Sequence, residues 1–492
     1  MQYSNPILYG DYSDPDVCRV GEDFYLISSS FTYLPGIPVL HSKDLVTWEQ
    51  VGHAVPRLPY PRYDVPAHRC GTWAPSIRWH DGLFYVYVCL PDEGLYAFTA
   101  KSPEGPWETH YVKDVVGWID PCPLFDDDGR AYLVHGLAAS RSGINNMLFV
   151  HEMSPDGFSI LDKGRLVYDG ADHGDTTVEG PKFYKKDGVY YIFCPAGGVA
   201  PGYQLCLRSQ TPCGPYERRV VLQQGSTDVN GPHQGGWVDD GHGRDFFIHF
   251  QDVGPYGRIC HLQPLVWADG WPQMGQNGEP VREGDTGLSG QVSEPLSMSD
   301  DFSGDSLALR WQFQANPRYD TLQFLHPGLR MQADVAANLY ESPCFLSQLM
   351  LHRNFDMTVR VKLHAKGQEM AGLAMMGYGY TGILLKEDQI CLIRGKVIPR
   401  DRWHRDEVTE TVEGVASWDG DSVVLCMSVR EGKVRYGYGK TGDDLRMLEE
   451  EHDLTVGGWV GARPGIFCLL EETETEKERG CADFTDLHVT EA

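Results

Sequence analysis

The chain has 492 residues, 41% of them hydrophobic, and a formal net charge of −27 at pH 7. A chain of this length exceeds one compact core, so two or three domains are expected. The acidity argues against nucleic acid and anionic membranes as partners, because both bind basic patches. It also disfavours anionic substrates such as uronic acids or phosphates, so a neutral substrate is expected.

The ends of the chain and its cysteines bear on the cellular compartment. Residues 1–6 contain neither a basic stretch nor an apolar run, so no signal peptide is expected. No apolar run is long enough to span a bilayer. The 13 cysteines are odd in number and scattered without CxxC pairs. We therefore expect free, mostly buried thiols and a location in the reducing cytoplasm.

Residues 1 to about 270 contain short strand signals separated by Gly, Pro, Asn and Asp, without long helical periodicity. Five of these signals are centred on aromatic residues that are 60, 47, 59 and 56 residues apart: Tyr25, Tyr85, Tyr132, Tyr191 and Phe247. A repeat with a period of ~50 residues is typical of propeller blades or solenoid turns. Five repeats predict five blades, with the last one a candidate for completion by an N-terminal strand.

A special residue precedes each aromatic centre by 11 to 14 positions, next to or near a proline: Asp14, Trp73, Asp120, Glu179 and His233. Equivalent positions of successive blades face one central channel. Three carboxylates, a tryptophan and a histidine are therefore expected in one cleft. Other acidic residues, such as Asp127, Asp128 and Asp187, sit beside turn glycines and are interpreted as turn residues.

The second half of the chain has a different composition and pattern and lacks the repeat. Residues of about 272–297 are rich in Gly and Pro and are interpreted as a linker. Alternating or apolar runs at 357–363, 423–429, 434–438 and 482–489 predict strands of a two-sheet sandwich. The first and last strands, near Asp301-Phe302 and 484–489, are expected to pair. The prediction is an all-β chain with a propeller over 1–285 and a concanavalin-like jelly-roll β-sandwich over 298–492.

Three carboxylates in one channel suit the hydrolysis of a glycosidic bond with inversion. One carboxylate takes a proton from water, and a protonated acid ~6.5–9.5 Å away donates to the leaving oxygen. A third carboxylate would raise the pKa of the acid by like-charge repulsion. This chemistry by itself leaves open which of Asp14, Asp120 and Glu179 has which role.

Several motifs resemble glycoside hydrolase family 43, in order and spacing, over nearly the whole chain. They include Asp14-Pro15-Asp16, His41 to Trp48, Trp73-Ala74-Pro75, Ile119-Asp120-Pro121 and Val178-Glu179-Gly180-Pro181. Gly461 to Phe467 and the closing Ala482-Asp483-Phe484 strand resemble the sandwich domain of the β-xylosidase branch.

The resemblance implies a five-bladed propeller and an inverting, exo-acting enzyme. By position, Asp14 resembles the general base and Glu179 the general acid. Asp120 resembles the residue that modulates the pKa of the acid and orients it. Arg258 matches a family arginine that contacts the terminal sugar. Four further residues match apolar positions around this sugar: Phe31, Trp73, Ala74 and Ile119.

The resemblance also bears on a metal ion and on the rim of the cleft. His233 matches a histidine that in parts of the family contacts a metal, often calcium, through waters, although Gly231-Pro232-His233-Gln234 replaces the usual Gly-Pro-Gly-His order. Because calcium prefers six to eight oxygen ligands, a hydrogen-bonded structural histidine is the favoured interpretation. In the sandwich, Arg463, with Phe467 nearby, is interpreted as the residue that leans over the active site in place of an aromatic side chain.

The sequence therefore predicts an exo-glycosidase that releases terminal β-D-xylose or α-L-arabinofuranose from neutral xylo- or arabino-oligosaccharides, a role in xylan degradation. No cofactor is required for this chemistry. One alternative is an arabinanase, and an alternative of another class is a non-catalytic sugar-binding protein. The resemblance also leaves a homo-oligomer open.

Overall fold

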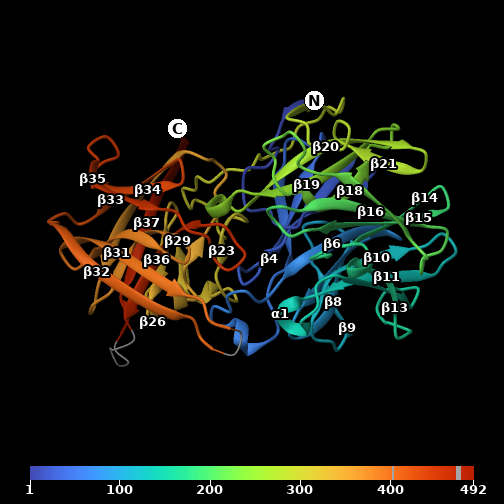
Figure 1. Ribbon diagram of the computed structural model, residues 1–492. Helices are drawn as coiled ribbons and strands as arrows, with labels where there is room; N and C mark the ends of the chain where they lie inside the picture. Colours follow the sequence, from blue (N-terminus) through green and yellow to red (C-terminus); the bar gives the residue numbers. More distant parts are fainter. Residues whose placement is uncertain (402–403, 472–477) are drawn as a thin grey trace.

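The computed structural model describes residues 1–401, 404–471 and 478–492. Two β-rich domains lie side by side, the first in blue to yellow-green and the second in orange and red (Figure 1). Helix in the described residues is limited to one α-helical turn and short 3-10 turns: α1 (Ala139–Ser142), η1 (Pro61–Tyr63), η2 (Gly170–Asp172), η3 (Gly254–Tyr256), η4 (Tyr319–Thr321) and η5 (Leu339–Glu341). Within that part of the chain, no helix is long and apolar enough to cross a membrane.

The first domain consists of five antiparallel four-stranded sheets, which confirms the predicted five-bladed propeller. Blade one contains β2 (Asp16–Val20), β3 (Asp23–Ile27), β4 (Gly36–Ser42) and β5 (Glu49–Val55). Blade two contains β6 (Trp73–His80), β7 (Leu83–Leu90), β8 (Gly94–Ala100) and β9 (Glu108–Lys113). Blade three contains β10 (Trp118–Phe125), β11 (Ala131–Leu137), β12 (Met147–Met153) and β13 (Arg165–Asp169). Blades four and five contain β14 (Lys182–Lys186), β15 (Val189–Ala196), β16 (Tyr203–Ser209), β17 (Glu217–Leu222); β18 (His233–Asp239), β19 (Asp245–Asp252), β20 (Arg258–Ala268) and β21 (Trp271–Met274).

The sequence repeat corresponds to the second strand of each blade. The five aromatic centres lie in β3, β7, β11, β15 and β19. Tight turns separate first and second strands, as at Asp187-Gly188, where both residues have a positive φ. This is the backbone of a type I′ hairpin, which Asp-Gly favours. The first strands approach one another around the axis, and blade five closes the ring against blade one.

Blade five is complete without the N-terminus, which differs from the expectation that an N-terminal strand fills it. Instead β1 (Gln2–Ser4) pairs with β22 (Glu283–Asp285) in a separate two-stranded ribbon. The predicted linker region thus contains this second strand of the ribbon. It then runs along blade one, where the backbone N–H groups of Ser293 and Glu294 donate to the carboxylate of Glu49.

The second domain is the predicted two-sheet sandwich. One sheet contains β23 (Gln312–Phe313), β27 (Leu346–Ser347), β36 (Arg463–Glu471), β29 (Met370–Met376), β30 (Thr381–Lys386), β31 (Gln389–Ile398), β32 (Glu407–Ser417) and, beside β36, β26 (Asp334–Ala336). The other contains β24 (Leu322–Phe324), β25 (Leu329–Gln332), β37 (Cys481–Glu491), β28 (Phe355–His364), β33 (Val423–Arg430), β34 (Lys433–Gly439) and β35 (Arg446–Asp453). The four strands expected from alternation are β28, β33, β34 and β37, and the expected contact of first and last segments is the bridge between Asp300 and Leu487.

Direct hydrogen bonds join the sandwich to the propeller. Leu34 of the propeller and Phe313 of the sandwich exchange two backbone hydrogen bonds, at N–O distances of 2.8 and 2.7 Å. The amide of Asn316 donates to the carbonyl of Leu58, and Leu58 N–H donates back to its side-chain oxygen. Because these groups are buried and mutually satisfied, the second domain has a defined position over the first.

Candidate active site

One pocket of about 390 Å³ opens at the end of the propeller axis, next to the sandwich. Of the nine residues that the sequence assigns to catalysis, sugar contact or a metal, eight line it: Asp14, Phe31, Trp73, Ala74, Ile119, Asp120, Glu179 and Arg258. The ninth, His233, is not among the lining residues. The prediction that three carboxylates distant in sequence meet in one cleft therefore holds in the geometry.

A common backbone feature brings these side chains together. In every blade, one residue at or just before the first strand has a left-handed backbone, with φ between 34° and 56°: Asp14, Ala74, Asp120, Gly180 and Gln234. In the blades that begin with β6, β10 and β18, the strand register also shifts at this point. Bulges of this kind redirect side chains near active sites. Each non-glycine residue in this conformation costs roughly 1–2 kcal/mol, so the rest of the blade must hold it in place.

Asp14 is buried and held by two donors. The hydroxyl of Ser29 donates to its Oδ2 at 2.6 Å, and Arg258 donates to its Oδ1 at 3.0 Å. Ser29 is itself fixed, because its Oγ accepts a hydrogen bond from Ala74 N–H at 2.7 Å. The carboxylate therefore has one orientation and a positive charge beside it.

Asp120 and Glu179 experience a different electrostatic environment. Burial, and to a smaller extent repulsion from Asp14, raises the pKa of Asp120 above its usual range. Burial, followed by repulsion from Asp120 and Asp14, raises the pKa of Glu179. The backbone N–H of Gly180 donates to Asp120 Oδ2 at 2.6 Å, which ties the acid-bearing segment to Asp120. Crowding of like charges in a buried site keeps one carboxyl group protonated near neutral pH.

Asp11, which the sequence reasoning did not select, anchors the arginine. Its buried carboxylate accepts from Arg258 N–H at 2.9 Å and from Ser13 Oγ at 2.8 Å. It also accepts at 2.8 Å from the backbone N–H of Gly461, which belongs to the sandwich. Gly257 lies so close that a Cβ there would be 2.4 Å from Asp11 Cγ. One carboxylate thus fixes both the backbone of Arg258 and a sandwich loop.

That sandwich loop brings Trp459 to the pocket. Trp459 lines the pocket and contacts Trp73 edge-to-face with ring centroids 4.7 Å apart. Its neighbour Val460 packs against the apolar wall formed by Phe31, Trp73 and Ile119. The sequence reasoning missed Trp459. The only local signal is its place in a glycine-rich stretch, Gly457-Gly458-Trp459-Val460-Gly461, directly before β36.

Arg463 and Phe467 are not the residues that lean over the site, which corrects the sequence-based interpretation. Arg463 is buried at the domain boundary, where its guanidinium stacks 3.9 Å from the ring centroid of Tyr33 and donates to Gln312 at 2.5 Å. Phe467 is buried in the core of the sandwich. Both are in β36, whose alternate residues point into packed layers, whereas the loop before the strand reaches the pocket.

His233 does not fit a calcium site. It is fully buried, its ring meets Phe250 edge-to-face, and neither ring nitrogen has a hydrogen-bond partner among the described residues. Burial and the nearby charge of Arg258 lower its pKa to about 3. In the described parts of the chain, no three His, Cys, Asp or Glu side chains are grouped to hold a metal. Calcium prefers six to eight oxygen ligands, and a single imidazole beside a guanidinium does not supply them.

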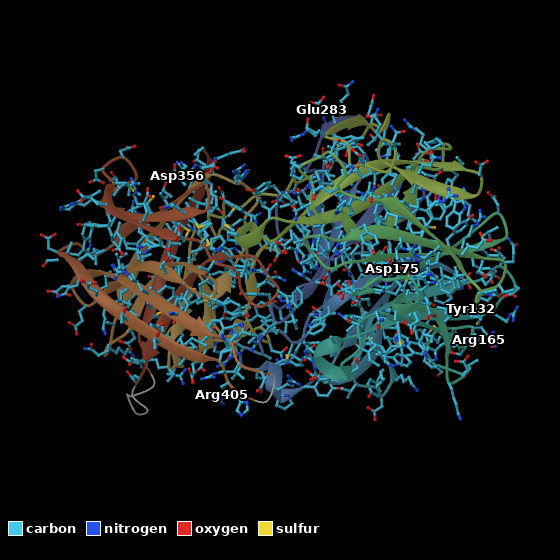
Figure 2. All side chains as sticks on the ribbon, in the orientation of Figure 1. Tyr132, Arg165, Asp175, Glu283, Asp356 and Arg405 are labelled. Atoms are coloured by element: carbon cyan, nitrogen blue, oxygen red, sulfur yellow. The ribbon has the colours of Figure 1, made fainter. Side chains whose placement is uncertain are left out.

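A second cleft, of about 640 Å³, continues from the pocket between the two domains. Ser140 and Trp459 line both spaces. Its walls include residues 65–70 of the propeller and Tyr340 of the sandwich, and Figure 2 shows Arg405, another lining residue, at the edge of the sandwich. A ligand bound in the pocket could therefore extend along the domain boundary.

Comparisons with known proteins agree with this architecture. The family model described as glycosyl hydrolases family 43 matches residues 3–272, and that described as the beta xylosidase C-terminal concanavalin A-like domain matches 299–490. A putative beta-xylosidase of Xylanibacter ruminicola is 42% identical over 399 residues, 79% of this chain and 73% of the relative. A non-reducing end alpha-L-arabinofuranosidase of Bacteroides ovatus is 34% identical over 401 residues, 76% of this chain and 73% of the relative. A solved family 43 structure from a xyloglucan locus of Bacteroides ovatus has a TM-score of 0.82 at 27% identity and covers 99% of this chain and 100% of its own.

Replacing Asp11 by Asn should destabilise the protein. The amide presents one acceptor and an N–H₂ group to three donors, so at least one buried donor is left without a partner, at a cost of roughly 1–3 kcal/mol. We expect the free energy of unfolding in urea to fall by about this amount. Asp421→Asn, at an exposed position, is the control and should leave it unchanged. Equal stability of D11N and the wild type would contradict this role of Asp11.

Proposed function

The chain belongs to glycosyl hydrolases family 43, a family of inverting enzymes, and we propose that it releases terminal β-D-xylose or α-L-arabinofuranose from neutral pentose oligosaccharides. The observation that carries the proposal is the pocket in which Asp14, Asp120 and Glu179 meet beside Arg258, under Trp459 of the sandwich. The relatives named as a beta-xylosidase and an alpha-L-arabinofuranosidase support these two sugars.

In the proposed reaction, Asp14 is the general base. Ser29 and Arg258 hold it, as a carboxylate, in one orientation. It takes a proton from a water molecule, and the oxygen of this water forms a bond to the anomeric carbon from the face opposite the leaving group. The configuration at the anomeric carbon is thereby inverted.

Glu179 is the proposed general acid. Its raised pKa keeps the proton in place near neutral pH, because burial and the carboxylates of Asp120 and Asp14 disfavour its ionised form. As the glycosidic C–O bond breaks, Glu179 gives this proton to the leaving oxygen. Asp120 is the proposed modulator, which raises the pKa of Glu179 and holds its segment through Gly180 N–H.

The shape of the site supports an exo-acting enzyme over an arabinanase that cuts inside a chain. Phe31, Trp73 and Ile119 form an apolar wall for one sugar, and the sandwich loop with Val460 packs against it. The cleft that starts at Trp459 gives the remainder of the substrate a path between the domains. The carboxylate trio, together with family membership, favours catalysis over the alternative of a sugar-binding protein.

The expected compartment and assembly belong to the same proposal. All 13 cysteines are free, and most are buried, which supports a reducing cytoplasm. The homo-oligomer that the resemblance leaves open stays a prediction. The proposed chemistry uses only side chains of the chain, and no calcium at His233 forms part of it.

Initial rates on nitrophenyl β-D-xyloside and nitrophenyl α-L-arabinofuranoside, with and without EDTA, test the function. We expect turnover of at least one glycoside and rates within about twofold after chelation, since the donor set around His233 does not fit calcium. Turnover of neither glycoside would overturn the proposed substrate class. A loss of activity in EDTA that added calcium restores would instead overturn the conclusion that His233 is not part of a calcium site.

Removing the proposed acid and base should give different patterns. Glu179→Ala should lower kcat/KM on xylobiose or arabino-oligosaccharides by about 10²–10⁴-fold. It should affect nitrophenyl glycosides far less, because a good leaving group needs little protonation. Asp14→Ala should abolish turnover of both kinds of substrate, and Glu108→Ala, on the exposed surface, should change neither. Equal losses on both substrates in E179A would contradict its assignment as the acid.

The pH dependence should reflect the raised pKa of Glu179. The reaction needs protonated Glu179, so kcat/KM on an oligosaccharide should fall as pH rises through that pKa, well above the usual value for glutamate. Asp120→Asn removes a like charge, lowers the pKa of Glu179 and should move the alkaline limb down by about one pH unit. An alkaline limb that stays in place in D120N would rule out the modulating role.

A further inference from the structure

Gln234, a residue without an assigned role, occupies the fifth of five equivalent positions around the axis. Its φ of 50° corresponds to the φ of 55° at Asp14 and 56° at Asp120. The register of blade five is therefore such that Gln234, and not His233, enters the pocket. In blades one and three, the residues at the position equivalent to Gln234 are Asp14 and Asp120, the two aspartates of the carboxylate trio.

The side chain of Gln234 is packed against the segment that carries the acid. A Cβ on Gly180 would lie 2.7 Å from Cδ of Gln234 and 3.0 Å from its Nε2, so its amide covers this glycine. Gly180 follows Glu179 directly and donates its N–H to Asp120. The amide of Gln234 thus packs against the glycine that follows Glu179 and is hydrogen-bonded to Asp120.

The backbone of Gln234 is bound, whereas its amide is available. Its N–H donates to Gln204 Oε1 at 3.1 Å, which fixes the strand end. Among the described residues, no protein group forms a hydrogen bond with the side-chain amide, although only 3% of the residue is exposed. An amide that lines a sugar-sized pocket and is not used within the protein offers a donor and an acceptor to a ligand.

Two other neutral polar side chains in the pocket, Asn145 and Thr177, are less suited to this task. Asn145 donates to Thr177 at 3.2 Å, so part of their capacity is used between them. Both belong to loops, whereas Gln234 is part of β18. The opposite wall is apolar, with Phe31, Trp73 and Ile119. Gln234 therefore offers a strand-held amide to a hydroxyl group of a sugar bound in this pocket.

We propose that Gln234 binds one hydroxyl group of the terminal pentose, donating from Nε2 and accepting at Oε1, and thereby sets which hydroxyl pattern the pocket accepts. The inference rests on the proposed function and adds a specificity-determining residue to it. Because an amide does not titrate, this contact is independent of pH. A substrate that lacks the hydroxyl leaves the buried amide unpaired and is rejected.

Monodeoxy substrates provide the test. Wild type and Gln234→Leu are compared on the nitrophenyl glycoside that the wild type turns over and on its monodeoxy derivatives, for the xyloside the 2-, 3- and 4-deoxy sugars. In the wild type, one deoxy derivative should lose about 10- to 100-fold in kcat/KM through loss of this contact. In Q234L, the parent glycoside should fall to the level of that derivative, so that the ratio between them shrinks to within about threefold.

Gln223→Leu, the same exchange at an exposed position outside the pocket, is the matched control and should leave that ratio at the wild-type value. A uniform loss on all substrates in Q234L, with the ratio preserved, would overturn the inference and leave Gln234 a packing residue. Gln234→Glu keeps the shape if Q234L does not fold. Its added charge beside Asp120 and Glu179 should move the alkaline limb of kcat/KM upward, and an unmoved limb would contradict the placement of the side chain. A wild type inactive on both parent glycosides would overturn the proposed function first, and this inference with it.

Discussion

The buried carboxylate of Asp11 is the interaction on which the active site depends. A carboxylate removed from water requires hydrogen-bond donors, and Asp11 finds them in Ser13, in the backbone of Arg258 and in the backbone of Gly461. Through Arg258 it sets the partner of Asp14, and through Gly461 it sets the loop that carries Trp459. The propeller and the sandwich therefore meet at one carboxylate group.

Local strain in the backbone is the second constraint. Every blade directs one left-handed residue toward the axis, and four of these are not glycine. Such conformations are unfavourable and persist only where surrounding structure holds them. Here the hydrogen-bonded blades hold them, and the result is a close approach of Asp14, Asp120 and Glu179. The raised pKa of Glu179 follows from that approach and from burial, so the unfavourable geometry and the proposed acid function have one origin.

The sandwich completes the site and does not act as a loosely attached module. The paired backbone bonds of Leu34 and Phe313, and the buried guanidinium of Arg463 over Tyr33, hold it against the propeller. Arg463 is thus part of the joint between domains, and burial lowers the pKa of its guanidinium. With this joint in place, Trp459 stands against Trp73, and the cleft between the domains begins where the pocket ends.

The sequence by itself determined the five blades, the sandwich strands and the carboxylate trio, because these depend on periodic patterns. Aromatic centres mark the second strands, and the special residues precede them at a nearly constant distance. That distance varies by a few residues. A shift of one position along a strand decides whether the side chain at its end points into the channel or into the layer behind it. The choice of Gln234 over His233, and of Trp459 over Arg463, was therefore made by the tertiary structure. Bulges and the docking of a second domain set those directions, and neither is written in a local pattern.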